Sequence, residues 1–445
     1  MKSNVIKYGK SNIEKLNFKI NNRDYLNSKC RKNPNDFTRK RKLTPKDLVL
    51  YNLNNKGKTT KMELNEFIEK CGLDNVSDAA LLKQREKLNE EVFKDLNDES
   101  MFDFYNNFQN EVKTFKGHLL LAKDGCDIEV PNTLETRQRY LAPKSKNKDR
   151  IARATLSNCY DVLNHFILDT RIRSYKYNEI ELANIHTEHI TSLIGELPSI
   201  SIRDRAYLSL SYIYRANINK ELFVIRIPKN TLKIEQRKLK SNDEWVEIDY
   251  QYDRIRYYLD KDLDFYNYYK DGSRMKVRIV KIPLSTGEEE ILITNLDKET
   301  FSTDDINYIY QCRWGIETSY GILKNSMMLT NISSSKDGII KQEIYATMLV
   351  HNILQGLIND VNSEIEQDKY KHKMKINFNM AVGFTKKYLI LILLETDVDK
   401  RQEMSDLLFE KILANIIPIR LGRKNPRKKN NAVYNKYPIN KRKSY

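Results

Sequence analysis

The chain has 445 residues, of which 40% are hydrophobic, and its 77 Lys and Arg outnumber 60 Asp and Glu to give a formal net charge of +17. This length and apolar content exclude a disordered chain and leave room for about three domains. The positive excess favours a polyanionic partner, with nucleic acid as the first candidate and a membrane surface as its rival.

The sequence also bears on the compartment. The longest apolar run, residues 388–394, is far shorter than the roughly 18 residues of a membrane-spanning helix. The N-terminal residues lack the apolar run of a signal peptide. Five cysteines without CxxC spacing indicate a reducing compartment and no zinc site. We therefore expect a cytoplasmic protein with no membrane-spanning part.

The first quarter of the chain is polar and then helical. Residues 1–43 end in the basic run 39–43 and predict a flexible basic arm or a lightly packed start, either solvated or in contact with DNA. The pair Thr44-Pro45 predicts the start of a helix. From there the apolar spacing stays helical to about residue 109.

The stretch from Lys58 to Phe93 has the length of a helix-turn-helix unit. Its first helix should end at Gly72, and its second should begin after Ser77, a residue type that caps helices. On one polar face the second helix presents three candidate DNA contacts, Lys83, Gln84 and Lys87. A small helical bundle without a DNA role is the alternative.

After residue 115 short apolar runs alternate with helical segments. Residues 117–125 are typical of a buried strand that ends at Asp124, and residues 200–204 are a second such run that ends at Asp204. Residues 151–173 fit strands and helices equally well. The other expected elements are helices over 177–197 and 208–217 and a strand over 221–227. This alternation predicts an α/β fold.

Residues 228–296 change character and predict a β-rich insertion. They are rich in Tyr, Val and Ile, contain Trp245, and have turn signals at Asp271-Gly272 and Thr286-Gly287. Further along, amphipathic helices are expected over 339–359 and 397–416, and a basic tail closes the chain.

One short helix, residues 310–324, places four functional groups on a single stripe. At about 100° per residue, the phenol of Tyr310, the guanidinium of Arg313, the carboxylate of Glu317 and the ammonium of Lys324 fall within an arc of about 60°. A solvated helix usually scatters its charges more widely. The alternative is an ordinary i,i+4 ion pair between Arg313 and Glu317.

Asp124, Asp204 and Glu317 together have the chemistry of a metal site for phosphoryl transfer. Such a site needs hard oxygen ligands for two divalent ions. Without cations, clustered carboxylates repel each other, so metal binding would give this group a physical purpose. The rival carboxylates are Asp127, Asp161 and Asp169.

These motifs resemble those of bacterial insertion-sequence DDE transposases of the Tyr-Arg-Glu-Lys signature group. The resemblance covers most of the chain, from about Phe37 to the basic tail. The signature helix is matched in full by Tyr310, Arg313, Glu317 and Lys324. The other matching segments are Asp124-Gly125, Asp204-Arg-Ala-Tyr207, Gln342-Glu343-Ile-Tyr345-Ala and Ile419-Arg420-Leu-Gly-Arg423.

The chain departs from the family pattern at two positions. Cys126 stands where the family usually has Thr or Ser, and Ala206 stands where it usually has Gly. If the family uses that glycine for a positive φ, Ala206 adds strain of about 1 kcal/mol.

The resemblance implies an RNase H-like core, in which residues 151–173 are the second and third strands and Asp204 follows the fourth. The α/β catalytic core then carries a β-rich insertion and is preceded by an α-helical DNA-binding domain. The expected parts are a basic N-terminal arm (1–43), a helical DNA-binding domain (44–115), the catalytic core (116–227 and 297–360), the insertion (228–296) and a helical C-terminal region with a basic tail (361–445).

The function implied by the resemblance is cut-and-paste DNA transposition. The enzyme would bind the terminal inverted repeats of an insertion sequence, cleave the element ends and join the 3′-OH ends to target DNA. Asp124, Asp204 and Glu317 would hold two Mg²⁺, for which Mn²⁺ can substitute. The expected phosphate contacts are Tyr310, Arg313 and Lys324.

The same resemblance implies the partners. These are double-stranded DNA, as terminal repeats and as target, and a second copy of the chain in the DNA complex, in a bacterial cytoplasm at the nucleoid. Some family members form a hairpin intermediate with a base flipped onto an aromatic ring, and Trp245 is a candidate for that contact, with simple packing as the alternative.

Two other classes of function compete with this one. A catalytically inactive, sequence-specific DNA-binding protein would be expected to have lost a carboxylate, whereas all three are present. An RNase H-like structure-specific nuclease would lack end-binding helices and would show no strand transfer.

Overall fold

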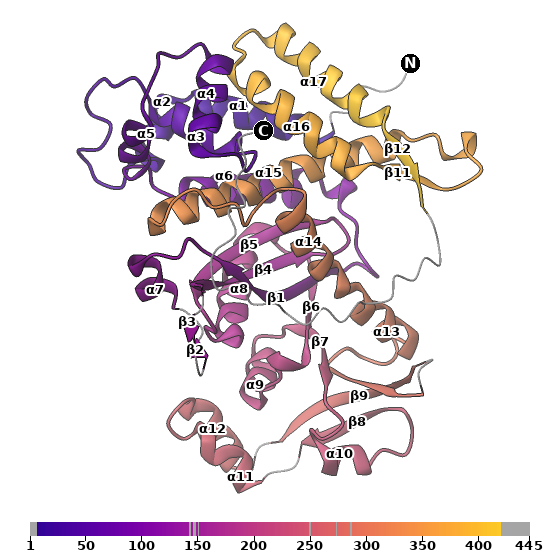
Figure 1. The fold of residues 1–445 in the computed structure, drawn as a ribbon. Coiled ribbons are helices and arrows are strands. Elements are labelled where there is room, and N and C mark those ends of the chain that lie inside the picture. Colours follow the sequence, from indigo (N-terminus) through magenta and orange to yellow (C-terminus); the bar gives the residue numbers. More distant parts are fainter. Residues whose placement is uncertain are drawn as a thin grey trace.

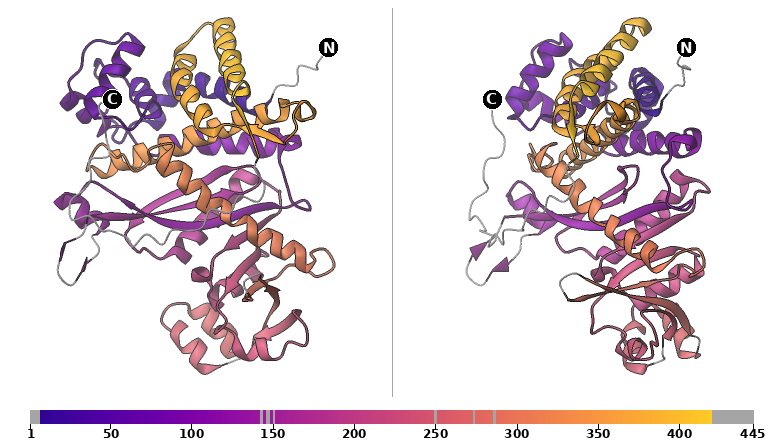
Figure 2. Two further views of the ribbon diagram at one scale, coloured as in Figure 1. Left: turned by 45° about the vertical axis from the view of Figure 1, so that its right-hand side comes forward. Right: turned by 90° about the vertical axis from the view of Figure 1, so that its right-hand side faces the viewer.

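An eight-stranded mixed sheet forms the centre of the computed structural model, which describes residues 7–419 except 142–143, 146–147, 150, 249–250, 273 and 285–286. The N-terminal and C-terminal helices lie together on one side of the sheet, and the insertion lies at the opposite end (Figures 1 and 2). The predicted α/β fold is confirmed. The basic tail, residues 420–445, lies outside the described residues.

The strand order of the sheet is β5-β4-β1-β6-β7-β10-β9-β8. β1 runs antiparallel to β4, and β4 runs antiparallel to β5, whereas β1, β6 and β7 are parallel. The strands are β1 Leu119–Glu129, β4 Arg153–Asp161, β5 Phe166–Ser174, β6 Ser199–Arg203, β7 Leu222–Ile227, β8 Asp243–Ile248, β9 Met275–Pro283 and β10 Glu289–Thr294. Residues 151–173, which pattern alone left open, therefore supply two strands.

Alternate residues of β1 enter two different cores. Leu120 and Ala122 pack with the helices α14 (Trp314–Asn325) and α15 (Asp337–Glu364). Leu119 and Leu121 pack with α6 and α8 on the opposite face. Because side chains alternate along a strand, Asp124 shares the face of Leu120 and Ala122, the face that α14 covers.

The helices outside the insertion are mostly those that the pattern predicts. They are α3 Pro45–Leu53, α4 Thr60–Cys71, α5 Asp78–Arg85, α6 Val92–Asn107, α7 Leu134–Tyr140, α8 Glu179–Ile194, α9 Leu210–Ile218, α13 Thr303–Cys312, α14, α15, α16 Phe378–Leu394 and α17 Val398–Leu413. Short strand pairs are β2 Lys144–Ser145 with β3 Lys148–Asp149, and β11 Met374–Ile376 with β12 Ile416–Pro418. None of the helices in the described ranges has the length and apolarity that crossing a membrane requires.

The flexible arm predicted for residues 1–43 is wrong for residues 8–29, which form α1 (Tyr8–Asn21) and α2 (Arg23–Lys29). Lys and Asn dominate the composition here, but Ile13, Leu16 and Ile20 form a buried stripe at helical spacing. α1 crosses α15 so closely that a Cβ on Gly9 would lie 2.7 Å from the carbonyl carbon of Gly356. This segment is therefore part of the packed fold.

The predicted second helix of the helix-turn-helix unit is shorter than expected. α5 ends at Arg85, and the chain turns before α6 begins. The turn pairs with the segment that follows α2, because the amide of Asn89 donates to the carbonyl of Cys30 at 2.8 Å and Arg31 forms a β-bridge with Leu88. This non-local pairing ends the helix where local pattern would have continued it.

Residues 44–115 have no core of their own. One hydrophobic cluster joins α1, α3, α4 and α6 to α15, α16 and α17. The N-terminal helices thus share one hydrophobic core with the C-terminal ones.

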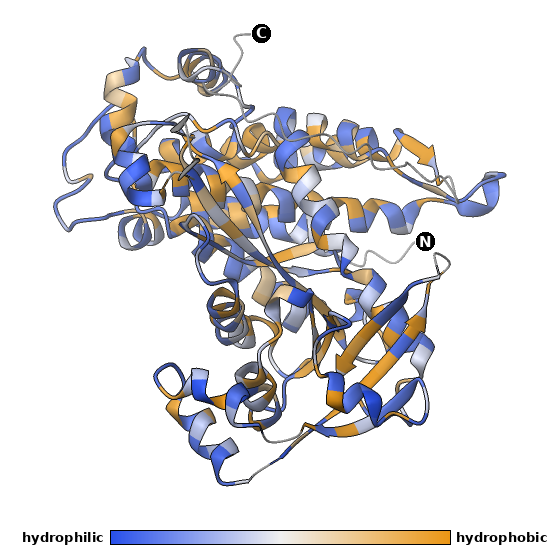
Figure 3. Ribbon diagram, turned by 60° about the horizontal axis from the view of Figure 1, so that its bottom comes forward, coloured by the Kyte–Doolittle hydropathy of each residue, from blue (hydrophilic) through white to orange (hydrophobic). Residues whose placement is uncertain are grey.

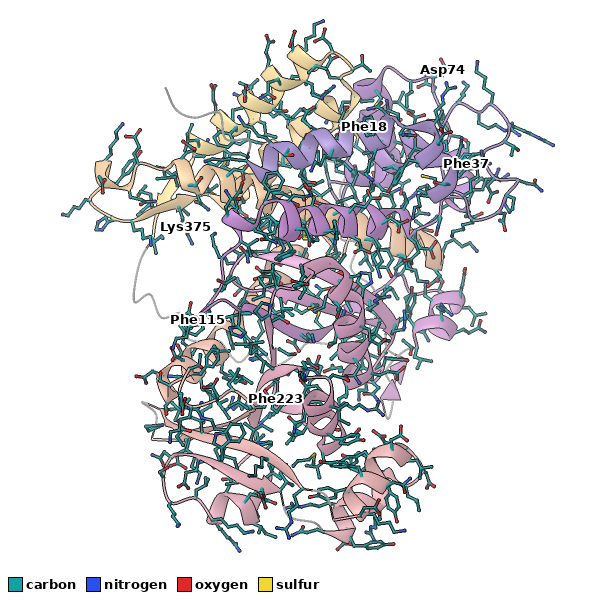
Figure 4. All side chains as sticks on the ribbon, turned by 180° about the vertical axis from the view of Figure 1, so that it is seen from behind. Phe18, Phe37, Asp74, Phe115, Phe223 and Lys375 are labelled. Carbon is teal, nitrogen blue, oxygen red and sulfur yellow. The ribbon has the colours of Figure 1, made fainter. Side chains whose placement is uncertain are left out.

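Residues 228–296 supply the strands β8, β9 and β10, which extend the central sheet. Figure 3 shows these strands largely in hydrophobic colours, and Figure 4 labels Phe223 of β7, which is buried in the core that they share. The insertion also holds helices that the sequence did not predict, α10 Lys233–Arg237, α11 Tyr252–Ile255 and α12 Leu263–Lys270.

Candidate active site

The two aspartates are held by neighbouring parallel strands. The register pairs Ala122 of β1 with Ile202 of β6, so Asp124 and Asp204 each stand two residues beyond the same pair. Asp204 directly follows β6 and accepts a hydrogen bond from the amide of Arg205 at 2.6 Å. Asp124 was expected at the end of its strand, but β1 continues beyond it to Glu129 because β4 pairs with this whole segment.

Glu317 reaches the site from the first turn of α14. The predicted single helix is divided at Arg313, which lies between α13 and α14 and turns its side chain toward the sheet. A guanidinium nitrogen of Arg313 lies 2.8 Å from Oε1 of Glu317, and another lies 4.0 Å from Oδ2 of Asp124. The i,i+4 pair is therefore formed, and it also connects Glu317 to the first aspartate.

Asp124 sits in an environment that disfavours its negative charge. Burial raises the pKa of Asp124 to about 7, against the opposing effects of the Gly125 amide and Arg313, and the charges of Glu179 and Asp204 raise it further. A carboxylate whose pKa is raised by burial is stabilised by added positive charge. The site is thus suited to receive a cation.

Two acidic residues at the site were missed by sequence reasoning. Glu179 begins α8, and its Oε1 would lie 3.1 Å from a Cβ placed on Gly125. Glu290 of β10 pairs with Arg226 at 3.4 Å, and burial raises its pKa. Neither has a local signal, since Glu179 looks like an ordinary first-turn acid and Glu290 like a strand-edge charge.

The backbone of Asp124 is fixed by two hydroxyl groups. The buried Tyr320 donates to the Asp124 carbonyl at 2.8 Å, and Ser157 donates to it at 3.3 Å. Ser157 lies 3.0 Å from Nε2 of His186, whose Nδ1 lies 2.8 Å from Asp169. This buried chain supports the strand beneath the site.

The rival carboxylates have other partners. Burial alone would raise the pKa of Asp169, but its hydrogen bond with His186 and the charges of Lys94 and Arg171 hold it below the usual value. Asp161 is buried and accepts from Tyr105 at 2.7 Å. Asp127 is exposed on β1. The first two therefore have structural roles.

The ends of the signature stripe lie apart. Tyr310 is buried on α13, and burial raises its pKa to about 12, with Asp204 and Glu290 contributing in the same direction. Lys324, at the other end of α14, donates to the carbonyl of Asp127 at 3.2 Å. The stripe thus runs along the site from Asp204 to the Asp127 segment.

Ala206 adds no strain of the expected kind. It lies in the 3-10 turn Arg205–Tyr207, and no positive φ occurs there. The position therefore accepts a Cβ, and this departure from the family pattern leaves the backbone of the site relaxed.

The predicted DNA contacts lie on two distant surfaces. Lys83 and Gln84 of α5, and Lys87 in the turn that follows it, share a cavity of about 660 Å³ with Arg41 and Lys42. Trp245 is 44% exposed on β8. β8 is five strand positions from β1, about 24 Å at the usual strand spacing, so Trp245 is not brought to the carboxylates. Its neighbours are Lys240, Arg274 and Lys298.

The carboxylates fit divalent metal ions by their chemistry. Among the described residues, no three His, Cys, Asp or Glu side chains are already grouped as a closed metal site. The guanidinium of Arg313 occupies the space between Asp124 and Glu317 and supplies the positive charge there. Carboxylate oxygens are the ligands that hard divalent cations prefer.

Comparisons with known proteins agree with this chemistry. The family model described as "Transposase DDE domain" matches residues 116–353, more than half of the chain. A solved structure described as "Cryo-EM structure of piggyBac transposase synaptic complex with hairpin DNA" is similar with a TM-score of 0.44 and 11% identity, over 95% of this chain and 88% of that chain. No curated protein matches the chain. The match over residues 116–353 shows that the chain belongs to the DDE transposase domain family and is a DDE transposase enzyme.

Proposed function

We propose that this transposase moves a bacterial insertion sequence by a cut-and-paste route, with Asp124, Asp204 and Glu317 as the catalytic carboxylates. It would bind the terminal inverted repeats, cleave the element ends and join the 3′-OH ends to target DNA. The observation that carries the proposal is the parallel register that sets Asp124 beside Asp204, with Arg313 connecting Asp124 to Glu317.

The order of the first five strands supports an RNase H-like core. Three antiparallel strands, β5, β4 and β1, are followed by the parallel strands β6 and β7. The strands of residues 228–296 extend this sheet at one edge and leave its order unchanged.

Asp124, Asp204 and Glu317 would hold two Mg²⁺, or Mn²⁺ in their place, and these ions would supply charge stabilisation and an activated oxygen nucleophile. Arg313 keeps Glu317 and Asp124 oriented toward each other before DNA arrives. Tyr320 fixes the strand that carries Asp124. Tyr310 and Lys324 are proposed phosphate contacts on either side of the carboxylates, and two ends to be cut make a homodimer in the DNA complex the expected assembly.

Cleavage of an element end tests the proposal directly. The purified chain, Mg²⁺ and a labelled duplex that carries the element's own end should give a nick at the boundary, and a supercoiled target plasmid should then receive the freed end. A duplex with a scrambled end is the control. Cleavage without joining would favour the structure-specific nuclease, and binding without cleavage would favour the inactive DNA-binding protein.

Arg313→Lys should raise the Mg²⁺ concentration for half-maximal cleavage by about tenfold, the value of one charge-assisted hydrogen bond. The planar fork of Arg313 serves Glu317 and Asp124 together, and a lysine ammonium does not reproduce it. Lys324→Arg is the matched control and should leave that concentration unchanged. Equal requirements in both variants would assign Arg313 to the DNA and not to the carboxylates.

Lys83→Ala with Lys87→Ala should weaken binding of the full-length chain to the element end. Removing two phosphate contacts should make the slope of log K against log salt less steep by about 2. Gln84→Ala should instead reduce the preference for the end over random duplex by about 1–3 kcal/mol, since amides read base edges. Unchanged binding in these variants would show that α5 is not part of the DNA-binding surface.

A further inference from the structure

Four lysines line a cavity of about 950 Å³ where α4, α14 and α16 meet. The lysines of this cavity, here called the lysine cavity, are Lys56, Lys70, Lys386 and Lys387. Asn325 and Ser326, at the C-terminal end of the helix that carries Glu317, form part of its wall. The cavity therefore lies between the N-terminal helices, the helix that carries Glu317 and the C-terminal helices.

The positive charge of the lysine cavity is poorly balanced. Lys56 pairs with Glu66 at 2.9 Å. Among the described residues, Lys70 donates to two neutral oxygens, at 3.4 Å to Asn54 and 3.5 Å to the Lys386 carbonyl. Lys386 donates to the carbonyl of Met327 at 3.5 Å. Within the described part of the chain, neither Lys70, Lys386 nor Lys387 lies within 4.0 Å of a carboxylate oxygen.

Electrostatics agree with this geometry. Burial lowers the pKa of Lys70 and of Lys386 to about 8, and the charge of Lys56 lowers both further, although Glu63 and Glu66 act in the opposite direction. Both ammonium groups remain charged at neutral pH, although no carboxylate oxygen of the described residues lies within 4.0 Å of either. An anion in the cavity would provide a counter-charge.

The wall from α16 also suits an anion. Asn379, Gly383, Lys386 and Lys387 recur along one side of this helix, and Asn379 belongs to its first turn, where free amides favour negative charge. A Cβ on Gly383 would meet no atom within 4 Å, so this side of the helix is open.

The distance between Glu317 and the wall of the lysine cavity is one that a DNA strand can span. From Glu317 to Ser326 the helix rises by about 13 Å, which corresponds to about four base pairs along a DNA strand. Lys324 lies between the two places and on the stripe of Glu317. A duplex that presents a phosphate to the carboxylates therefore has further backbone phosphates at this range.

We propose that the lysine cavity binds a backbone phosphate of the DNA about four base pairs from the cleaved bond. The proposal rests on the cleavage site proposed above for Asp124, Asp204 and Glu317. Such a contact would fix the DNA relative to both the N-terminal helices and the catalytic helix. The competing role for these lysines is purely structural, since Lys386 also reaches a carbonyl beyond the end of α14.

The test compares salt dependence of binding between charge-matched variants of the full-length chain. The probe is a labelled 40-base-pair duplex of random sequence, so that no knowledge of the terminal repeat is needed. Lys70→Met with Lys386→Met should make the slope of log K against log salt less steep by about 2. The control, Lys371→Met with Lys375→Met, removes two exposed charges near β11 and should leave the slope unchanged (Lys375 is labelled in Figure 4). Equal slopes in the two double variants would overturn the proposal.

Further variants separate binding from folding. Lys70→Arg with Lys386→Arg keeps the charge and should keep the wild-type slope, whereas a purely structural role would not distinguish Met from Arg by salt slope. If the Met variant does not fold, the exposed Lys387→Glu should lower the slope by itself, and an unchanged slope there would overturn the proposal. Millimolar inorganic phosphate should weaken DNA binding by the wild type but not by Lys387→Glu if the cavity is a phosphate site. Equal weakening in both proteins contradicts the proposal.

The outcome for the lysine cavity is separable from that for the catalytic site. If the wild type binds and cleaves DNA but the lysine variants keep its salt slope, only the proposal for the lysine cavity is rejected. If the salt slopes are as expected but the wild type does not cleave the element end, the proposed function is rejected. The lysine cavity then still stands as a DNA contact.

Discussion

Asp124→Ala, Asp204→Ala and Glu317→Ala are each expected to reduce cleavage of the element end by at least about 10³-fold, because stabilisation of charge by a bound metal ion is worth several kcal/mol. Binding of the same duplex should change little, since these residues are proposed to hold metal ions and not the repeat. Cleavage is measured in single-turnover reactions with Mg²⁺, and binding is measured without Mg²⁺.

Asp127→Asn is the matched control for the three alanine variants. Asp127 lies on the same strand as Asp124, is exposed and is the nearest rival by sequence. It should retain cleavage close to that of the wild type. Wild-type cleavage in any of the three alanine variants would mean that its carboxylate is wrongly assigned. If Asp127→Asn lost cleavage while Asp124→Ala kept it, the catalytic role would belong to Asp127 and not to Asp124.

Local sequence patterns predicted those parts of the fold that depend on neighbours in the chain. The cap at Thr44 with Pro45, the left-handed glycine after α4 at Gly72 and the cap at Ser77 are all present. Each depends on hydrogen bonds within one turn of a helix, so the residue type carries the information. The strands with β-branched residues, such as β7, were found for the same reason.

The missing parts depend on contacts between distant segments. The sequence pattern did not predict α1, because most of its residues are polar and its apolar stripe is narrow. The burial of α1 also requires the close approach of Gly9 to Gly356. Glu179 reaches the active site through the packing of α8 on the sheet, and Glu290 reaches it through the strand order. Likewise, the interruption at Arg313 aims its guanidinium at Asp124, which lies far away in the sequence.

The segment Gln342-Glu343, recognised in the sequence only by resemblance, has a physical role in the structure. Gln342 donates to the carbonyls of Arg85 at 2.7 Å and Leu88 at 2.8 Å. Glu343 pairs with the buried guanidinium of Arg85 at 3.0 Å. These contacts attach α5, with its proposed DNA-binding face, to the long helix α15.

Arg85→Met is therefore expected to lower the free energy of unfolding by about 3–5 kcal/mol, because it leaves the buried carboxylate of Glu343 without its cation. Arg85 also donates to Asn52 at 2.8 Å and to Ser333 at 3.1 Å, so the loss reaches α3 and the segment before α15. The measurement is urea denaturation of the full-length chain. Lys83→Met, an exposed change of the same type on α5, should stay within about 0.5 kcal/mol of the wild type.

The double variant Arg85→Met with Glu343→Gln distinguishes the buried ion pair from simple packing. Removing the second charge relieves the unpaired carboxylate, so the double variant should be more stable than Arg85→Met alone. If the two variants were equally stable, the loss would come from the missing hydrogen bonds of the guanidinium to Asn52 and Ser333. A loss below about 1 kcal/mol in Arg85→Met would place the pair in the range of exposed ion pairs, and the attachment of α5 to α15 would then have to rest on Gln342 and the surrounding apolar contacts.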